Sequence, residues 1–68
     1  MEQVKPDVAT EAEVAEALQM GKQSLATMRY QGVGPKFLKL GGAVRYRWSD
    51  VNAWLDENTR QSTRAGVA

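Results

Sequence analysis

Apolar side chains recur at helical spacing near the start of the chain. Three of them lie at positions i, i+3 and i+4 of one short stretch: Val14, Ala17 and Leu18. This spacing predicts an amphipathic helix over residues 11–18. Thr10 followed three residues later by Glu13 matches a capping box, in which each side chain bonds to the other residue's backbone N–H. The helix is therefore expected to begin directly after Thr10.

A second helix is predicted over residues 22–31. Leu25 and Met28 lie three apart and face inward together, and Gly32 follows as a C-terminal stop. Only residues 19–21 separate the two helices, and the last of them is a glycine. Two short helices joined by a tight, glycine-containing turn are typical of a helix-turn-helix.

A β-hairpin is predicted after the helices. The strand-like runs 36–40 and 43–48 flank Gly41-Gly42, and both glycines can take the positive φ that two-residue hairpin turns favour. Alternation in the second run separates apolar side chains from two guanidinium groups: Val44, Tyr46 and Trp48 share one face, and Arg45 and Arg47 the other. We therefore expect the two arginines side by side on the exposed face.

A third helix is predicted from Ser49, its N-cap, to about Asn58. Its core stripe is Val51, Trp54 and Leu55. We expect four aromatic side chains to build the core: Phe37, Tyr46, Trp48 and Trp54. Trp54→Ala is accordingly expected to unfold the domain. The domain would span residues 10–58, between a flexible tail at residues 1–9 and a flexible or partly helical tail at residues 59–68.

Charge is unevenly distributed, although the net charge of the 68 residues is only +1. Residues 1–20 carry one base and five acids, residues 21–48 six bases and no acid, and residues 49–68 two bases and three acids. An acid-free basic stretch indicates a polyanion-binding surface, and an ordinary solvated surface is the alternative. The bases fall on the second helix and the hairpin, which are the DNA-contacting elements of a winged helix-turn-helix. We predict this fold, mainly α with a small β-hairpin, and binding to double-stranded DNA.

The hairpin region carries a family resemblance. The segment GVGPKFLKLGGAVRY at residues 32–46, followed by SDVNAWL at residues 49–55, resembles the MerR-like winged helix of phage excisionases and AlpA-type regulators. TEAEVA at residues 10–15 and Ser24-Leu25 resemble the same family's helix-turn-helix, so the resemblance covers residues 8–57. It implies an excisionase, a recombination directionality factor that bends attachment-site DNA beside a tyrosine- or serine-type integrase and binds in several cooperative copies. A small AlpA-like transcriptional regulator is the alternative.

The candidate DNA contacts are polar and basic side chains on two elements. On the second helix they are Lys22, Gln23, Ser24, Thr27, Arg29 and Tyr30, and on the wing Lys39, Arg45 and Arg47. Ser24 is alternatively a local cap, Tyr30 alternatively packs under the wing, and Arg47 alternatively pairs with Asp50. Strand parity places Lys36 and Lys39 on opposite faces, so only one is expected to meet DNA well. Arg60 and Arg64 would share a face only if the last residues were helical.

Composition restricts the other function classes. The chain has no histidine and no cysteine, which excludes Ser-His-Asp and Cys-His catalysis and a thiolate zinc site. We therefore expect no enzymatic activity, no cofactor and no metal. The polar first residues and the lack of a long apolar run predict no membrane association and a cytoplasmic protein of a bacterial host. A protein-interaction module is the alternative from another class, and RNA binding is disfavoured because exposed stacking aromatics are scarce.

Overall fold

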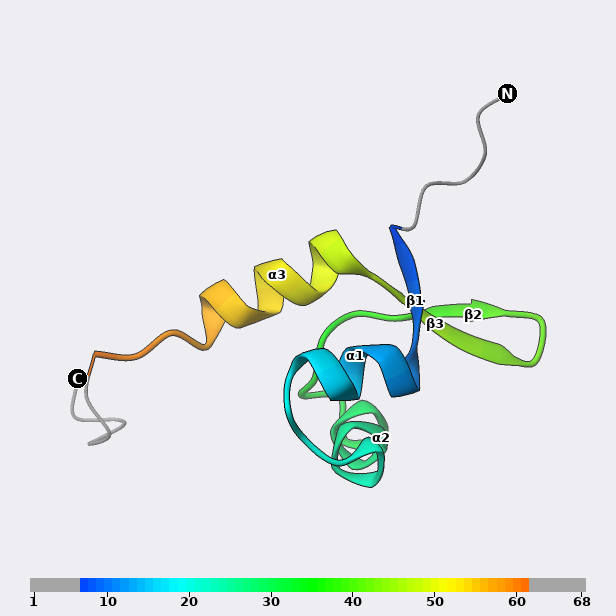
Figure 1. Cartoon of the computed structure of the whole chain (residues 1–68), viewed down its shortest axis with the longest axis horizontal. Coiled ribbons are helices and arrows are strands. Elements are labelled where there is room, and N and C mark those ends of the chain that lie inside the picture. Colours follow the sequence, from blue (N-terminus) through cyan, green and yellow to red (C-terminus); the bar gives the residue numbers. More distant parts are fainter. Residues whose placement is uncertain (1–6, 62–68) are drawn as a thin grey trace.

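The computed structural model describes residues 7–61, which form three short helices and a small three-stranded antiparallel sheet (Figure 1). The order is β1 (Val8–Thr10), α1 (Glu11–Ala17), α2 (Lys22–Gln31), β2 (Leu38–Leu40), β3 (Ala43–Arg47) and α3 (Trp48–Glu57). The predicted winged helix-turn-helix, mainly α with a small hairpin, is confirmed. Within the described residues, no helix combines the length and the apolar character that crossing a membrane requires.

The sheet contains a third strand that the sequence analysis did not predict. β1 pairs antiparallel with β3, the central strand of the order β1-β3-β2. The expected flexible tail is wrong for Val8 and Ala9, because both lie in β1 and Ala9 is only 2% exposed opposite Tyr46. Residues 1–6 of that tail lie outside the described residues. The extra strand supports the hairpin, since a two-stranded ribbon alone is marginally stable.

The capping box at the start of α1 is confirmed. The Thr10 hydroxyl accepts a bond from the Glu13 N–H at 3.1 Å, and the Glu13 carboxylate accepts one from the Thr10 N–H at 2.9 Å. Thr10 is also the last residue of β1, so the strand leads into the helix without a loop. The cap thereby fixes the direction in which α1 leaves the sheet.

α1 and α2 end in the same hydrogen-bond pattern. A single residue with a left-handed backbone follows each helix. It is Gln19 (φ 57°) after α1 and Gly32 (φ 74°) after α2. In both cases its N–H bonds to the carbonyl three residues back, and the next N–H bonds to the carbonyl five residues back, at 3.0–3.1 Å. Gly21, the glycine expected to shape the turn, has an ordinary φ of −70° and is the N-cap of α2.

The core draws on every element except β2. Its buried members are Ala9, Val14, Ala15, Leu25, Tyr46 and Val51. The predicted aromatic core is right for Tyr46, which is fully buried, and wrong for Phe37, which is 43% exposed. Trp48 is half-buried against the cluster. Trp54 is half-buried outside it and donates its indole N–H to the Val33 carbonyl at 2.9 Å.

α3 begins two residues earlier than expected. Its N-cap is Arg47 rather than Ser49, and no side chain caps it. β3 runs directly into the helix, and the Trp48 N–H donates to the Asp7 carbonyl at 2.9 Å beside β1. The hairpin and α3 extend in opposite directions, to the right and to the left in Figure 1.

The end of α3 lies where it was predicted, with Asn58 as the C-cap. Residues 59–61 are not helical. The Arg60 guanidinium donates to the carbonyls of Glu57 and Thr59, at 3.1 and 3.3 Å, and so covers the end of its own helix. Arg64 lies outside the described residues. The helical tail on which a shared face of Arg60 and Arg64 depended is absent at residues 59–61.

The hairpin turn closes between Leu40 and Ala43, as predicted. Of its two glycines only Gly41 has a positive φ, 65°. A single left-handed residue at the first turn position is the pattern of a type II′ turn, whose twist matches the flanking strands.

Candidate nucleic-acid interface

One face of α2 carries an exposed row of polar side chains. Gln23, Thr27 and Tyr30 lie at i, i+4 and i+7, and all three are exposed. Lys22 and Ser24 are exposed beside them. The opposite face packs into the core through Leu25 and Met28. We refer to Lys22, Gln23, Ser24, Thr27 and Tyr30 as the helix face.

The positions of Tyr30 and Ser24 decide between the alternatives given for these two residues. Tyr30 is 83% exposed, so the alternative that it packs under the wing is wrong. Ser24 does not cap α2, because the N-cap is Gly21 and no side chain bonds to the helix N-terminus. Both side chains are thus free to contact a ligand outside the protein. Hydroxyl and amide groups on such a face can bond to phosphates and to base edges.

Arg29 is oriented differently from the other predicted contacts on α2. Its Nε lies 3.0 Å from Glu11 Oε2 and its Nη2 lies 3.4 Å from Glu11 Oε1, and the two side chains are only 19% and 12% exposed. The guanidinium also lies over two aromatic rings, 5.3 Å from the Tyr30 centroid and 5.7 Å from that of Phe37. Arg29 is therefore an internal ion-pair partner, and its placement among the DNA contacts is corrected.

Glu11 accepts a further bond from the core. The Tyr46 hydroxyl donates to Glu11 Oε2 at 2.9 Å, so one carboxylate holds Arg29 and Tyr46 together. We call Glu11, Arg29 and Tyr46 the triad. The hydrogen bond from Arg29, more than any other cause, places the pKa of Glu11 below its ordinary 4.5. Burial, and then the bond to Glu11, raises the pKa of Tyr46 to about 12. The triad is ionised at Glu11 and neutral at Tyr46 at physiological pH.

The strand register divides the predicted wing contacts between two faces. Lys39 lies opposite Val44, on the side of the sheet where Tyr46 meets the helices. Arg45 and Arg47 alternate with Val44 and Tyr46 along β3 and therefore lie on the outer side. Lys39 is exposed on the same side of the sheet as α2. Lys39 therefore lies on the opposite side of the sheet from the two arginines.

The two wing arginines differ in how free they are. Arg45 is half-buried in the central strand, between Thr10 and Leu38, and its Nη1 donates to the Val44 carbonyl at 2.8 Å. Arg47 has a side chain that is 52% exposed, and its Nη1 lies 3.9 Å from Asp50 Oδ2. An exposed pair at that distance is worth about 0–1 kcal/mol, so Asp50 holds Arg47 only weakly.

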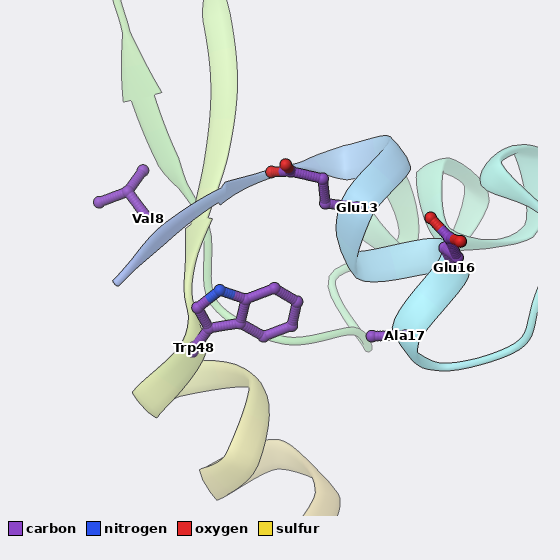
Figure 2. Close-up of a pocket in the computed structure, with 5 residues that line it drawn as sticks. All are labelled: Val8, Glu13, Glu16, Ala17 and Trp48. Carbon is purple, nitrogen blue, oxygen red and sulfur yellow. The ribbon is translucent and has the colours of Figure 1, made fainter. Parts of the chain in front are cut away.

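Two acidic side chains of α1 line a groove that includes no residue of α2 or the hairpin. A shallow groove between β1, α1 and the first residue of α3 is lined by Val8, Glu13, Glu16, Ala17 and Trp48 (Figure 2). The indole of Trp48 lies across from Ala17, and both carboxylates come from α1. None of the lining residues belongs to α2 or to the hairpin. The groove would repel phosphates, which leaves the helix face and Lys39 as the side suited to DNA.

The internal position of Arg29 had a signal in the sequence. Arg29 is four residues after Leu25, so helical spacing places it beside the buried face and not on the polar one. The role of Glu11 had no comparable signal, because a first-turn acid is already explained by the helix dipole. The partner that gives Glu11 its role is 18 residues away from it in the sequence.

Comparison with known proteins agrees with this geometry. A family model described as a helix-turn-helix domain matches residues 10–59, which is most of the chain. No curated protein matches the chain. The match begins at the cap of α1 and extends past the end of α3, so it includes the helix face, the hairpin and the triad. The chain therefore belongs to the helix-turn-helix domain family.

Proposed function

We propose that this chain is a sequence-specific DNA-binding excisionase without catalytic activity of its own. Membership of the helix-turn-helix family indicates DNA binding. The observation that carries the proposal is the exposed polar helix face of α2, and Lys39 is exposed on the side of the sheet where Tyr46 meets the helices. α2 would enter the major groove with Gln23, Thr27 and their neighbours against the bases, and the hairpin would lie on the adjacent backbone.

The excisionase assignment rests on the resemblance of the segments at residues 32–46 and 49–55 to phage excisionases. In this role, several copies bind side by side at an attachment site in a bacterial cytoplasm, bend the DNA and favour excision by a tyrosine- or serine-type integrase. A small AlpA-like transcriptional regulator would use the same surface. The two are distinguished by the DNA they prefer, an attachment site or a promoter.

A gel-shift series tests the proposal. The protein is titrated into attachment-site DNA, promoter DNA and a scrambled duplex over a range of salt concentrations. About four to six phosphate contacts give a log–log salt slope near −4 to −5. Preferential, stepwise shifts on attachment-site DNA support an excisionase, and preference for promoter DNA supports the regulator. Equal, weak binding to all three duplexes would contradict sequence-specific recognition.

Matched variants locate the contact surface. Gln23→Ala changes an exposed amide on α2, and Asn52→Ala changes an exposed amide on α3. A bidentate amide contact to adenine contributes about 1–3 kcal/mol of discrimination, so Gln23→Ala should lose roughly 5- to 150-fold of the preference for specific DNA. Asn52→Ala should bind as the wild type does. Equal losses in both variants would place the contact surface elsewhere.

A further inference from the structure

The triad connects the two elements that are proposed to meet DNA. Glu11 lies in the first turn of α1, Arg29 in the last turn of α2, and Tyr46 in the central strand β3. Its contacts are 3.0 Å from Glu11 to Arg29 Nε and 2.9 Å from Glu11 to the Tyr46 hydroxyl. Both donors reach the same oxygen, Oε2, in a part-buried setting. A charged, bridging acceptor of this kind strongly restricts the groups it holds.

The triad also extends to the first residue before the wing strands. The Arg29 guanidinium lies 5.7 Å from the ring centroid of Phe37, which precedes β2, and that ring lies 6.4 Å from the ring of Tyr46. α2 packs mainly on α1 and has few contacts with the sheet. The side chains around Glu11 are therefore a principal connection between the end of α2 and the hairpin.

We propose that Glu11 is a positioning residue for DNA recognition, which sets the angle between α2 and the hairpin through Arg29 and Tyr46. The inference rests on the proposed DNA binding by the helix face and the wing, and not on the excisionase role. With the angle fixed, α2 and the hairpin meet one duplex together without reordering. If the angle is not fixed, each element still binds DNA. Binding of the second element then has the added entropic cost of ordering α2 relative to the hairpin.

The test compares two substitutions on the same helix. Glu11→Gln and Glu16→Gln each remove one negative charge, but Glu16 is exposed and belongs to no hydrogen bond or ion pair of the triad. Each protein is titrated with two duplexes: the full specific site, and a site shortened from the end that the hairpin covers. The measured quantity is the gain in affinity that the longer duplex provides. Circular dichroism melts confirm that each variant is folded.

We expect Glu11→Gln to reduce this gain by about 2- to 30-fold while it binds the short duplex as Glu16→Gln does. Tyr46→Phe removes only the hydroxyl donor, keeps the core volume, and should reduce the gain in the same direction. It carries the test if Glu11→Gln does not fold. A purely structural role would lower the melting temperature and leave the gain unchanged.

The two proposals fail in different ways. If the wild type prefers the specific site and Glu11→Gln keeps the full gain, as Glu16→Gln does, the positioning role is overturned and DNA binding stands. If Tyr46→Phe and Glu11→Gln both keep the full gain in affinity, the positioning role is likewise overturned and DNA binding stands. If the folded wild type distinguishes neither duplex from scrambled DNA, the proposed function is overturned, and the positioning role with it.

Discussion

Gln19 has the least favourable backbone conformation for its residue type in the described chain. It takes a left-handed φ of 57° in the motif that Gly32 completes after α2. A residue with a Cβ has about 1–2 kcal/mol of strain there, whereas glycine has essentially none. The two positions therefore make a natural pair of opposite experiments, since the hydrogen bonds around them are alike.

Gln19→Gly is expected to raise the free energy of unfolding by about 0.5–1 kcal/mol, because relief of strain exceeds the added freedom of the unfolded chain. Gly32→Ala is expected to lower it by about 1 kcal/mol. A Cβ at Gly32 would meet no atom within 4 Å, so the loss of stability in Gly32→Ala measures backbone strain and not a steric clash. Urea or thermal unfolding measures both, with about 4–8 °C per kcal/mol for a domain of this size. Shifts of the same sign in both variants would contradict the shared motif.

The triad predicts how stability depends on pH. The pKa of Glu11 is lowered on folding, so the unfolded chain binds more protons and stability is lost as pH falls through the region below 4.5. The pKa of Tyr46 is raised to about 12, so the folded chain keeps its proton longer and stability is lost as pH rises from 10 towards 12. Glu11→Gln should flatten the acid limb of a melting-temperature profile and Tyr46→Phe the alkaline limb. Glu16→Gln, as the control, should leave both limbs as they are.

At the scale of elements, α3 is attached to the domain by few side chains. Val51 is 1% exposed and is its buried anchor, while Leu55 is 41% exposed and Trp54 bonds to the loop carbonyl of Val33. Because Trp54 lies outside the core cluster, the structure does not support the expectation that Trp54→Ala unfolds the domain. The indole holds the loop before the hairpin against α3, and the core lies elsewhere.

We therefore predict that Trp54→Ala retains a cooperative melt at a lower temperature. Trp54→Phe should lose about 1 kcal/mol, since it removes the N–H donor and keeps most of the apolar ring. Val51→Ala should lose more, about 2–3 kcal/mol, because it leaves a cavity in the core. Chemical denaturation of the three variants compares these values. If Trp54→Phe is more harmful than Val51→Ala, then α3 is held mainly through its indole.

The two faces of the hairpin predict different effects on DNA binding. Lys39 lies on the side of the sheet where Tyr46 meets the helices, and we propose that it contacts one phosphate. Lys39→Ala should therefore make the salt slope less steep by about one unit. Arg47→Ala removes one charge from the outer side and should leave the slope unchanged. Binding to specific DNA over a salt series measures both. If both substitutions reduce the salt slope equally, the hairpin enters a groove with both of its faces against DNA.

The elements that the sequence predicted well are those fixed by neighbouring residues. α2 and the capping box of α1 follow from local spacing and local hydrogen bonds, and both were found at the predicted residues. β1 was missed because three residues are too few to show alternation, and it forms only by pairing with β3. Arg29 was misassigned although its helical spacing from the buried Leu25 indicated an internal position, and its partner Glu11 comes close only after folding.

For the whole molecule, the described residues contain one small core and no separate dimerisation element. We predict a monomer in sedimentation experiments without DNA, and discrete additional complexes on DNA as further half-sites are added. Stepwise gel shifts on duplexes with one, two and three sites check the second part. A stable dimer in the absence of DNA would contradict the expectation that copies associate only when bound side by side.

The junction between β3 and α3 has a mechanical consequence. No loop separates the strand from the helix at Arg47, and the hairpin and α3 extend to opposite sides of the core. Because the strand continues directly into the helix, we expect a tilt of the hairpin to be transmitted to α3. A helix of ten residues is about 15 Å long, so a tilt of about 10° moves its far end by about 3 Å. We therefore expect a shift of the hairpin on DNA to move the exposed end of α3 by a similar distance.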